Sequence, residues 1–499
     1  MQPLTSTTLL LLALSIFAEA GSPDSCTPPN FPLPEFKSAS FSVRDFGAIG
    51  NGQVNDTAAI NRAIEKCSAT GGGDVVFPPG TYLAASIHLQ SNVRFRLDKD
   101  AVISGAKNGY DPPEPNQFEK YQDFGHSHFH NALMWGEKIE NFAIVGGRIN
   151  GGHIIEGDDP PGRDIGDKVI AIKSSRNLLF DGVTHESGGH MVYLLNDCEN
   201  ITLSNIVIKK SRDAVNLVSC RNVQMHDCNF TGCGDDTVAL KSDYALGRKI
   251  ASANIYVWNS YLETAANALA IGAETVGDFR NLNFWNIRVG RAWKAGIAIH
   301  SIDGAIVDGA TYKNISMKSV DVPVSILVRK RLLTGEPNPR VGAIRNIAIS
   351  NLAADEPRPR QRGVVKPSLI VGLPDGPVEN VLLEHARILA KGGPNNRMPT
   401  FGEDKEKPKE SRTALTAAGF FMMHARTVRL HDVTLSYQSE DPRPSLVATG
   451  LSELELEDCN MQRFAGVRLI RLEKIEKCVV RRSTGLSERN GERVDVAEE

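Results

Sequence analysis

A short motif that returns along the chain constrains the fold more than any other feature. It is an Asn followed by an aliphatic, a variable and a second aliphatic residue, as in NITL at 200–203. Its copies begin at Asn141, Asn177, Asn200, Asn222, Asn254, Asn281, Asn346 and Asn380. Two consecutive steps are 23 and 22 residues long, and the pattern is strand-like rather than helical. Such a period is typical of one coil of a parallel β-helix, whose coils must stack to bury their apolar side chains.

Stacked coils place equivalent residues above one another, about 4.8 Å apart. We therefore expect Cys198 above Cys220 and a ladder of the repeated Asn side chains at one turn. Most of these residues are then structural. Eight cysteines in 499 residues are too few for a disulfide scaffold. The candidates for local disulfides are Cys26, Cys478 and the Cys228/Cys233 pair.

The N-terminus is predicted to direct export. In residues 1–20 an apolar run is followed by Ala18-Glu19-Ala20, the small-x-small pattern of a signal-peptide cleavage site. We expect a secreted or periplasmic protein whose mature chain begins at Gly21. N-terminal sequencing of secreted protein tests this expectation.

The rest of the chain is predicted to form one β-helix with short additions at its ends. Residues 21–40 are a Pro-rich leader, which cannot form a helix or a central strand. Residues 41–110 hold an N-terminal helical cap, with a helix that starts at Asp56 or Thr57, and the first coils. Residues 111–480 form the catalytic β-helix, and residues 481–499 form a C-terminal tail.

Charge and hydropathy exclude two classes of partner. The chain has 56 Lys and Arg against 59 Asp and Glu, a formal net charge of −3. This balance excludes nucleic-acid binding by bulk positive charge. No stretch after the first twenty residues approaches about 18 apolar residues, so no membrane association is expected. We expect a monomer.

The densest acidic cluster consists of Asp213, Asp235 and Asp236. Asp213 lies 22 to 23 residues before the Asp pair, which is one coil, so the three carboxylates should meet on one exposed face of adjoining coils. Like charges this close raise one another's pKa. Glycosidases need one carboxyl group kept protonated as an acid and another ionised as a base. A solvated Gly-Asp-Asp turn is the alternative interpretation.

These motifs resemble the polygalacturonase-like glycoside hydrolases of family 28. The likeness covers about residues 40 to 460 and is carried by FSVRDFGAIGNGQVNDTAAINRAI, GGGDVVFPPGTYL, DAVNLVSCRNVQMHDCNFTGCGDDTVALKS and PSLIVGLPDGPVENVLLEHARI. It implies an all-β, right-handed, single-stranded parallel β-helix of the pectin-lyase-like type and an inverting hydrolysis of pectic or related plant polysaccharide. It further implies that Asp235 is the general acid and that Asp213 and Asp236 hold the attacking water.

The resemblance is incomplete at the substrate site. The family's Asn-Thr-Asp is Ser211-Arg212-Asp213 here, its Gly-His-Gly aligns with Ala266-Asn267-Ala268, and its carboxylate-binding Arg-Ile-Lys aligns with Ala298-Ile299-His300. Ala cannot replace an Arg that binds a carboxylate. We therefore expect a rhamnogalacturonan-type or other linkage rather than plain homogalacturonan. The predicted substrate-binding residues are Asn267, His300, Lys241, Arg329 and Lys330; Arg291 and Lys294 are further cations nearby, and each cation is otherwise a solubilising loop charge.

Three alternating histidines, His126, His128 and His130, form another motif. No Cys or carboxylate lies at ligand spacing, so substrate contact or a surface loop is favoured over a metal site, and no cofactor is expected. Two other functions stay open. One is a polysaccharide lyase or epimerase on the same β-helix, and the other is a non-catalytic glycan-binding protein. The expected partner in each case is a polysaccharide or oligosaccharide.

Overall fold

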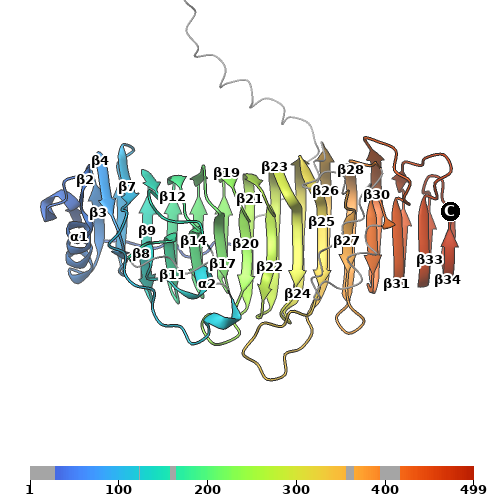
Figure 1. The fold of residues 1–499 in the computed structure, drawn as a ribbon, viewed down its shortest axis with the longest axis horizontal. Coiled ribbons are helices and arrows are strands. Elements are labelled where there is room, and N and C mark those ends of the chain that lie inside the picture. The colour runs from blue at the N-terminus through green and yellow to red at the C-terminus, as the bar shows by residue number, and fades with distance from the viewer. Residues whose placement is uncertain (1–27, 123, 158–163, 356–364, 394–415) are drawn as a thin grey trace, which may run out of the picture. The chain divides into compact units, whose positions relative to one another are not determined.

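The computed structural model describes residues 28–122, 124–157, 164–355, 365–393 and 416–499. The predicted signal peptide and Cys26 lie outside these residues. The chain divides into the units Met1–Asn30 and Phe31–Glu499, and the second contains every described helix and strand. In this unit 34 strands are hydrogen-bonded into one sheet, and the pairings between strands are parallel except that between β33 and β34. The predicted all-β stack of parallel strands is confirmed (Figure 1).

The strands follow three columns, which we call faces A, B and C. Face A contains β5 (Ile87–His88), β8 (Ala132–Glu137), β11 (Lys168–Lys173), β14 (Met191–Asn196), β17 (Asp213–Val218), β20 (Val238–Ser242), β22 (Leu269–Thr275), β25 (Val320–Val328), β27 (Ser368–Val371) and β29 (Phe420–Met423). Face B contains β1 (Ser40–Ser42), β3 (Gly73–Phe77), β6 (Val93–Leu97), β9 (Glu140–Val145), β12 (Arg176–Asp181), β15 (Glu199–Ser204) and β18 (Arg221–His226). Face C contains β2 (Asn51–Asn55), β4 (Gly80–Ala84), β7 (Ala101–Gly105), β10 (Arg148–Asn150), β13 (Thr184–Ser187), β16 (Val207–Ile208), β19 (Asn229–Cys233) and β32 (Asn460–Met461).

Longer strands bend round the corners and contribute to more than one face. They are β21 (Ser252–Thr264), β23 (Phe279–Ser301), β24 (Ile306–Lys318), β26 (Ala343–Asp355), β28 (Val378–Ala390), β30 (Thr427–Tyr437), β31 (Leu446–Glu457) and β33 (Ile470–Arg481). Residues 481–499, predicted as a tail, carry β34 (Arg489–Glu498), which pairs antiparallel with β33. The chain thus ends in a paired strand.

The helices of the described residues are short and few. Helix α1 (Thr57–Ala69) forms as predicted, because Ile60, Ala63, Ile64 and Cys67 recur on one face and are buried. It contacts β1, β3 and β5 near the first strands (Figure 1); a role as cap of the stack stays a prediction. The others are α2 (Phe124–Ser127) and the 3-10 helices η1 (Val43–Phe46) and η2 (Glu119–Tyr121). No helix of the described residues is long and apolar enough to span a membrane.

The Asn ladder is confirmed. Each of these Asn residues has a left-handed backbone with φ near 55°, as at Asn200 and Asn222. The side-chain amide of Asn200 donates to the side-chain oxygen of Asn177 over 2.9 Å, and Asn222 donates to Asn200 over 3.0 Å. Asn tolerates this backbone better than other residues with a side chain, and its amide can both donate and accept. The repeated Asn therefore fixes the same turn in successive coils.

We expect Asn200→Ala to destabilise the fold by about 2–3 kcal/mol. Ala loses two side-chain hydrogen bonds, worth about 1 kcal/mol each, and is strained at positive φ. Urea unfolding measures the change. Asn200→Gly, which removes the same bonds without the strain, should lose less. Wild-type stability of the Ala variant would contradict the role of the ladder.

Most buried apolar residues of the described chain form one large cluster, which contains aromatic stacks among its aliphatic side chains. Phe77, Phe95, Phe142 and Phe180 lie above one another, with ring centres 5.2–6.4 Å apart. Cys198 and Cys220 are buried at matching positions, as predicted. The candidate disulfides are contradicted within the described residues: Cys228, Cys233 and Cys478 are buried free thiols. Their side chains belong to the large apolar cluster and form no disulfide bonds with one another.

Candidate active site

Three carboxyl groups meet where two neighbouring coils enter face A. Asp213 is the first residue of β17, and Asp235 and Asp236 precede β20 in the next coil. The backbone N–H of Asp235 donates to the carbonyl of Arg212 over 2.9 Å, and that of Ala214 to the carbonyl of Asp236 over 3.0 Å. The one-coil spacing in the sequence therefore becomes a contact between adjacent coils.

The expected exposure of this cluster is wrong for two of its members. Asp213 and Asp236 are only 4% and 9% exposed, whereas the Asp235 side chain is 29% exposed. Asn216 and Lys241 contact the carboxyl group of Asp213, and Asn267 contacts that of Asp236, so protein side chains cover these two acids. Burial, opposed by Lys241, and the neighbouring Asp235 raise the pKa of Asp213 to about 6. Burial, then Asp213 and Asp235, raises the pKa of Asp236 to about 7.

Asn267 contacts the buried pair directly. Its backbone N–H and its side-chain amide donate to Oδ1 of Asp236 over 3.1 and 2.9 Å. Asn267 thus touches the acidic cluster directly from the next coil, just before β22 on face A. Oδ1 of Asp213, in contrast, is buried and accepts no hydrogen bond from the described residues. An oxygen of this kind is a place for a water molecule or a substrate hydroxyl.

Asp235 forms ion pairs with two cations. Nζ of Lys294 lies 3.1 Å from its Oδ1, and a guanidinium nitrogen of Arg212 lies 3.5 Å from its Oδ2. Arg212 also lies 2.7 Å from Nε2 of His190, whose Nδ1 is 2.7 Å from the carbonyl oxygen of Gly157. Arg212 thus joins Asp235 to His190.

Lys241 lies beneath the acidic cluster and is only 7% exposed. Its Nζ is 3.2 Å from Glu274, 3.1 Å from Nε2 of His126 and 3.9 Å from Oδ2 of Asp213. Burial alone would raise the pKa of Glu274, but Lys241, His126 and Arg331 outweigh it and lower that pKa. Direct substrate contact by Lys241 stays a prediction, and its observed partners are protein groups.

The remaining predicted substrate residues lie in the next coils of face A. His300 is half-buried, and its Nε2 is 2.9 Å from Oγ of Ser325. Burial, followed by Arg329 and Lys294, lowers the pKa of His300 to about 3, so its ring is neutral at pH 7. Arg329 is half-buried beside it, whereas the exposed Lys330 pairs with Asp375 at 2.6 Å. Substrate contact by these three residues stays a prediction.

The three alternating histidines do not share one site. His126 contacts Lys241, and the ring of His128 stacks on Phe124. Within the described chain, potential metal ligands gather at Glu114, His130 and Glu137. Nζ of Lys173 lies 2.7 Å from each of these two carboxylates. The Lys173 ammonium therefore supplies the positive charge that a metal ion would bring.

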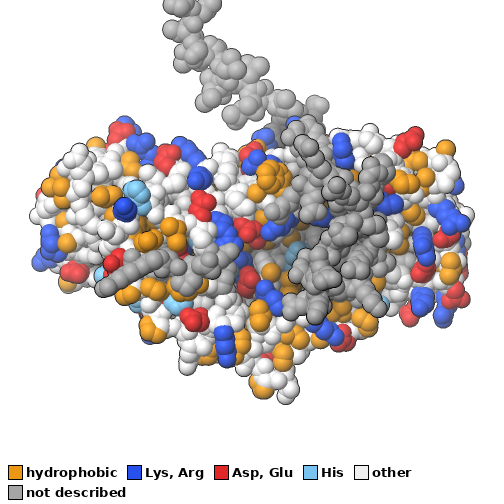
Figure 2. All heavy atoms as spheres, viewed as in Figure 1, with side chains coloured by type: hydrophobic (Ala, Val, Ile, Leu, Met, Phe, Trp, Pro, Cys, Tyr) orange, Lys and Arg blue, Asp and Glu red, His pale blue; other side chains and the backbone are white. Residues whose placement is uncertain are grey.

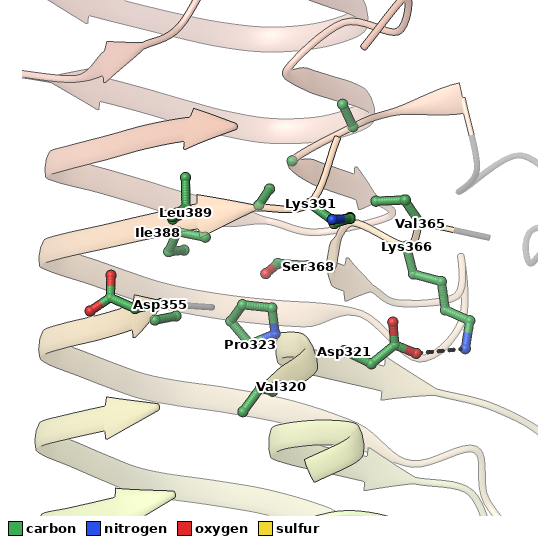
Figure 3. A pocket seen from close by; sticks show the side chains of 14 residues that line it. Val320, Asp321, Pro323, Asp355, Val365, Lys366, Ser368, Ile388, Leu389 and Lys391 are labelled. Atoms are coloured by element: carbon green, nitrogen blue, oxygen red, sulfur yellow. Dashed lines mark hydrogen bonds and ion pairs between the residues drawn. The ribbon is translucent and has the colours of Figure 1, made fainter. Parts of the chain in front are cut away.

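Figure 2 shows acidic and basic side chains side by side near the middle of the viewed face. A separate pocket lies further toward the C-terminus, where β25 and β27 begin, and its Asp321 and Lys366 pair at 3.3 Å (Figure 3). None of the predicted site residues lines that pocket.

Comparisons with known proteins agree with this architecture. Residues 40–291, just over half of the chain, match a family model described as rhamnogalacturonase A/epimerase, pectate lyase-like. The chain belongs to this family. A probable polygalacturonase of Vitis vinifera is 25% identical over 267 residues, which cover 49% of this chain and 53% of that protein. The resemblance to polygalacturonase-like proteins is thereby confirmed.

Two further matches widen the range of relatives. Plasmin and fibronectin-binding protein A of Streptococcus pneumoniae is 26% identical over 241 residues, 46% of this chain and 31% of that protein. The chain thus spans about a third to a half of these curated relatives. A family 28 exopolygalacturonase of Yersinia enterocolitica has the same fold, with a TM-score of 0.61 at 16% identity over 84% of this chain and 78% of that one.

Sequence reasoning missed the ion pairs that surround the aspartates. Arg212 is the middle residue of an aligned tripeptide, Glu274 lies outside the quoted motifs, and His126 is predicted only for substrate contact or a surface loop. One signal was available: Lys241 stands inside an apolar strand, VALKS, and a buried ammonium requires a buried acid. The acid one coil later is Glu274, at the end of LAIGAE.

Proposed function

We propose that this protein is a secreted glycoside hydrolase that cleaves a pectic or related plant polysaccharide by an inverting acid–base mechanism. The observation that carries the proposal is the meeting of Asp213, Asp235 and Asp236 from adjacent coils, two of them buried with raised pKa values. Family membership and the polygalacturonase relatives support the substrate class. Residues 1–20 support export.

The roles are those that the family resemblance implies, and the greater exposure of Asp235 supports its place at the leaving group. Asp235 is the most exposed of the three and protonates the leaving oxygen. Asp213 and Asp236 face one another from neighbouring coils and, when ionised, accept the hydrogens of a water molecule between them. The proton passes from water to this pair as the water oxygen attacks the anomeric carbon. An inverting site needs such room for water, whereas a nucleophilic mechanism leaves the third acid without a role.

The first test is a product screen on pectic and neutral plant glycans. Hydrolysis gives a new reducing end, and proton NMR taken before mutarotation should show the inverted anomer. A retained anomer, or a trapped glycosyl-enzyme, would overturn the mechanism.

The same screen separates the other two functions. A lyase gives an unsaturated product that absorbs in the ultraviolet, and an epimerase changes the sugar without new chain ends. The relative named plasmin and fibronectin-binding protein A favours testing binding as well. A glycan-binding protein would retain oligosaccharide unchanged, with or without Asp235. We also propose that the substrate contacts Asn267, His300, Arg329 and Lys330. Replacing one of these residues by Ala should then raise KM.

A further inference from the structure

Lys241 is buried between two acids, whereas a lysine that binds substrate directly must reach the surface of the site. Its side chain is 8% exposed and lies between an acid of the proposed active site, Asp213, and an acid outside it, Glu274. Nζ is 3.9 Å from Asp213 and 3.2 Å from Glu274. The ammonium is therefore shared unequally, with the greater part of its attraction directed to Glu274.

A chain of ion pairs holds Glu274 in turn. Arg331 lies 3.4 Å from Glu274 and also pairs with Asp303. On the other side, His126 lies 3.1 Å from Lys241 and 3.7 Å from Asp243. Glu274 thus holds two cations from different coils. A movement of the Lys241 ammonium toward or away from Asp213 would therefore change its contacts with Glu274 and His126.

We propose that Lys241 is a positioning residue that keeps Asp213 ionised, and that Glu274 sets how strongly it does so. This deepens the proposed hydrolase function and rests on it. A buried cation near a buried carboxylate favours the ionised form. Asp213 must be ionised to take a proton from water, so Lys241 lowers the pH at which activity is lost. Asp236 must be ionised as well, and Lys241 acts on its charge in the same direction.

The other groups around Asp213 do not provide the same control. Arg212, Asp235 and Asp236 also act on its charge, and Asn216 donates to its Oδ2 over 3.1 Å. Arg212 is committed to Asp235 and His190, and the two acids oppose ionisation. The thiol of Cys233 lies nearby with its own pKa raised by burial. Among these groups, Lys241 is the buried cation that also pairs with an acid outside the cluster, Glu274.

The test is the acidic limb of the pH profile of kcat/KM in two variants. Lys241→Met removes the cation and should move the limb up by about 1 pH unit or more. Glu274→Gln removes the competing acid, leaves Lys241 to act on Asp213 alone, and should move the limb down. Lys241→Arg, which keeps the charge, should restore most of the wild-type profile. Unchanged limbs, or shifts of the same sign in both variants, would overturn the proposal.

Lys173 provides a matched control. It occupies the same row of face A, since Lys173 pairs in register with Asn196, Asn196 with Val218 and Val218 with Lys241. It also pairs with two acids, Glu114 and Glu137. Lys173→Met should leave the acidic limb in place. An equal shift in this variant would show that any lost buried ion pair moves the profile.

A second readout does not need an active enzyme. The gap in melting temperature between wild type and Lys241→Met should widen as the pH rises through about 6, where Asp213 ionises. In an Asp213→Asn background this widening should shrink. If no glycan is hydrolysed, the proposed function fails while this coupling still tests Lys241. A gap that is the same with and without Asp213 would refute the coupling itself.

Discussion

Replacing Asp235 by Asn is expected to lower kcat by about 10²–10⁴-fold on the glycan that the wild type hydrolyses. Asn cannot deliver a proton to the leaving oxygen. It keeps the size of Asp, but it has only one of the two oxygens that accept from Lys294 and Arg212. Substrate affinity should change little. Initial rates and KM, measured side by side for both proteins, give this result.

Asp308→Asn is the matched control for Asp235→Asn. Asp308 lies on face B in β24 and accepts hydrogen bonds from Arg345 and Asn346, away from face A. Its replacement should leave kcat unchanged. Full activity of Asp235→Asn would remove Asp235 from the chemistry and favour the binding-protein interpretation.

Asp236→Asn is expected to abolish most activity and yet make the fold more stable above pH 7. The pKa of Asp236 is raised from 3.8 to about 7, chiefly by burial, so the folded protein disfavours the carboxylate. Below pH 4 the carboxyl group is protonated in the folded and the unfolded chain, so it does not change the free energy of unfolding. That free energy falls as the pH rises from about 4 to about 7, and the loss is complete above pH 7. One pKa unit corresponds to about 1.4 kcal/mol, so a shift from 3.8 to about 7 sets an upper limit of roughly 4 kcal/mol on the gain for the neutral Asn.

Thermal melts of both proteins at pH 4 and pH 8 measure this effect. The curves should nearly coincide at pH 4, and the variant should melt higher at pH 8. Asp308→Asn has the opposite sign, because Arg345 and Asn346 lower the pKa of Asp308 despite its partial burial. It should lose stability at pH 8. A variant of Asp236 that melts lower than wild type at pH 8 would contradict the burial cost.

The wild-type pH profile follows from the same groups. Asp213 and Asp236 must be ionised to activate water, so activity should fall as pH drops through about 7 to 6. These buried acids make the fold less stable in the pH range in which the proposed reaction runs. A loss of stability at a functional site is a common cost of catalysis.

The sequence by itself determined the stack of coils and which acids come together. The Asn motif repeats because Asn tolerates the left-handed backbone that every copy of the motif adopts at this turn. The step of 22 residues between neighbouring motifs then predicts that Asp213 lies beside Asp235 and Asp236, which are one step further along the chain. Helix α1 was equally readable from its buried apolar face.

Only the tertiary structure decided the burial of the acids and their partners. Asp213 and Asp236 were expected to be exposed, but coil-to-coil contacts bury both. The pairs Lys241–Glu274 and Asp235–Lys294 join residues 33 and 59 positions apart, through side chains that leave the regular period. A repeat fixes where each backbone segment lies. Long charged side chains reach from one coil to another, and partners such as Lys294 depend on the three-dimensional path of the intervening loops, so the repeat by itself does not identify them.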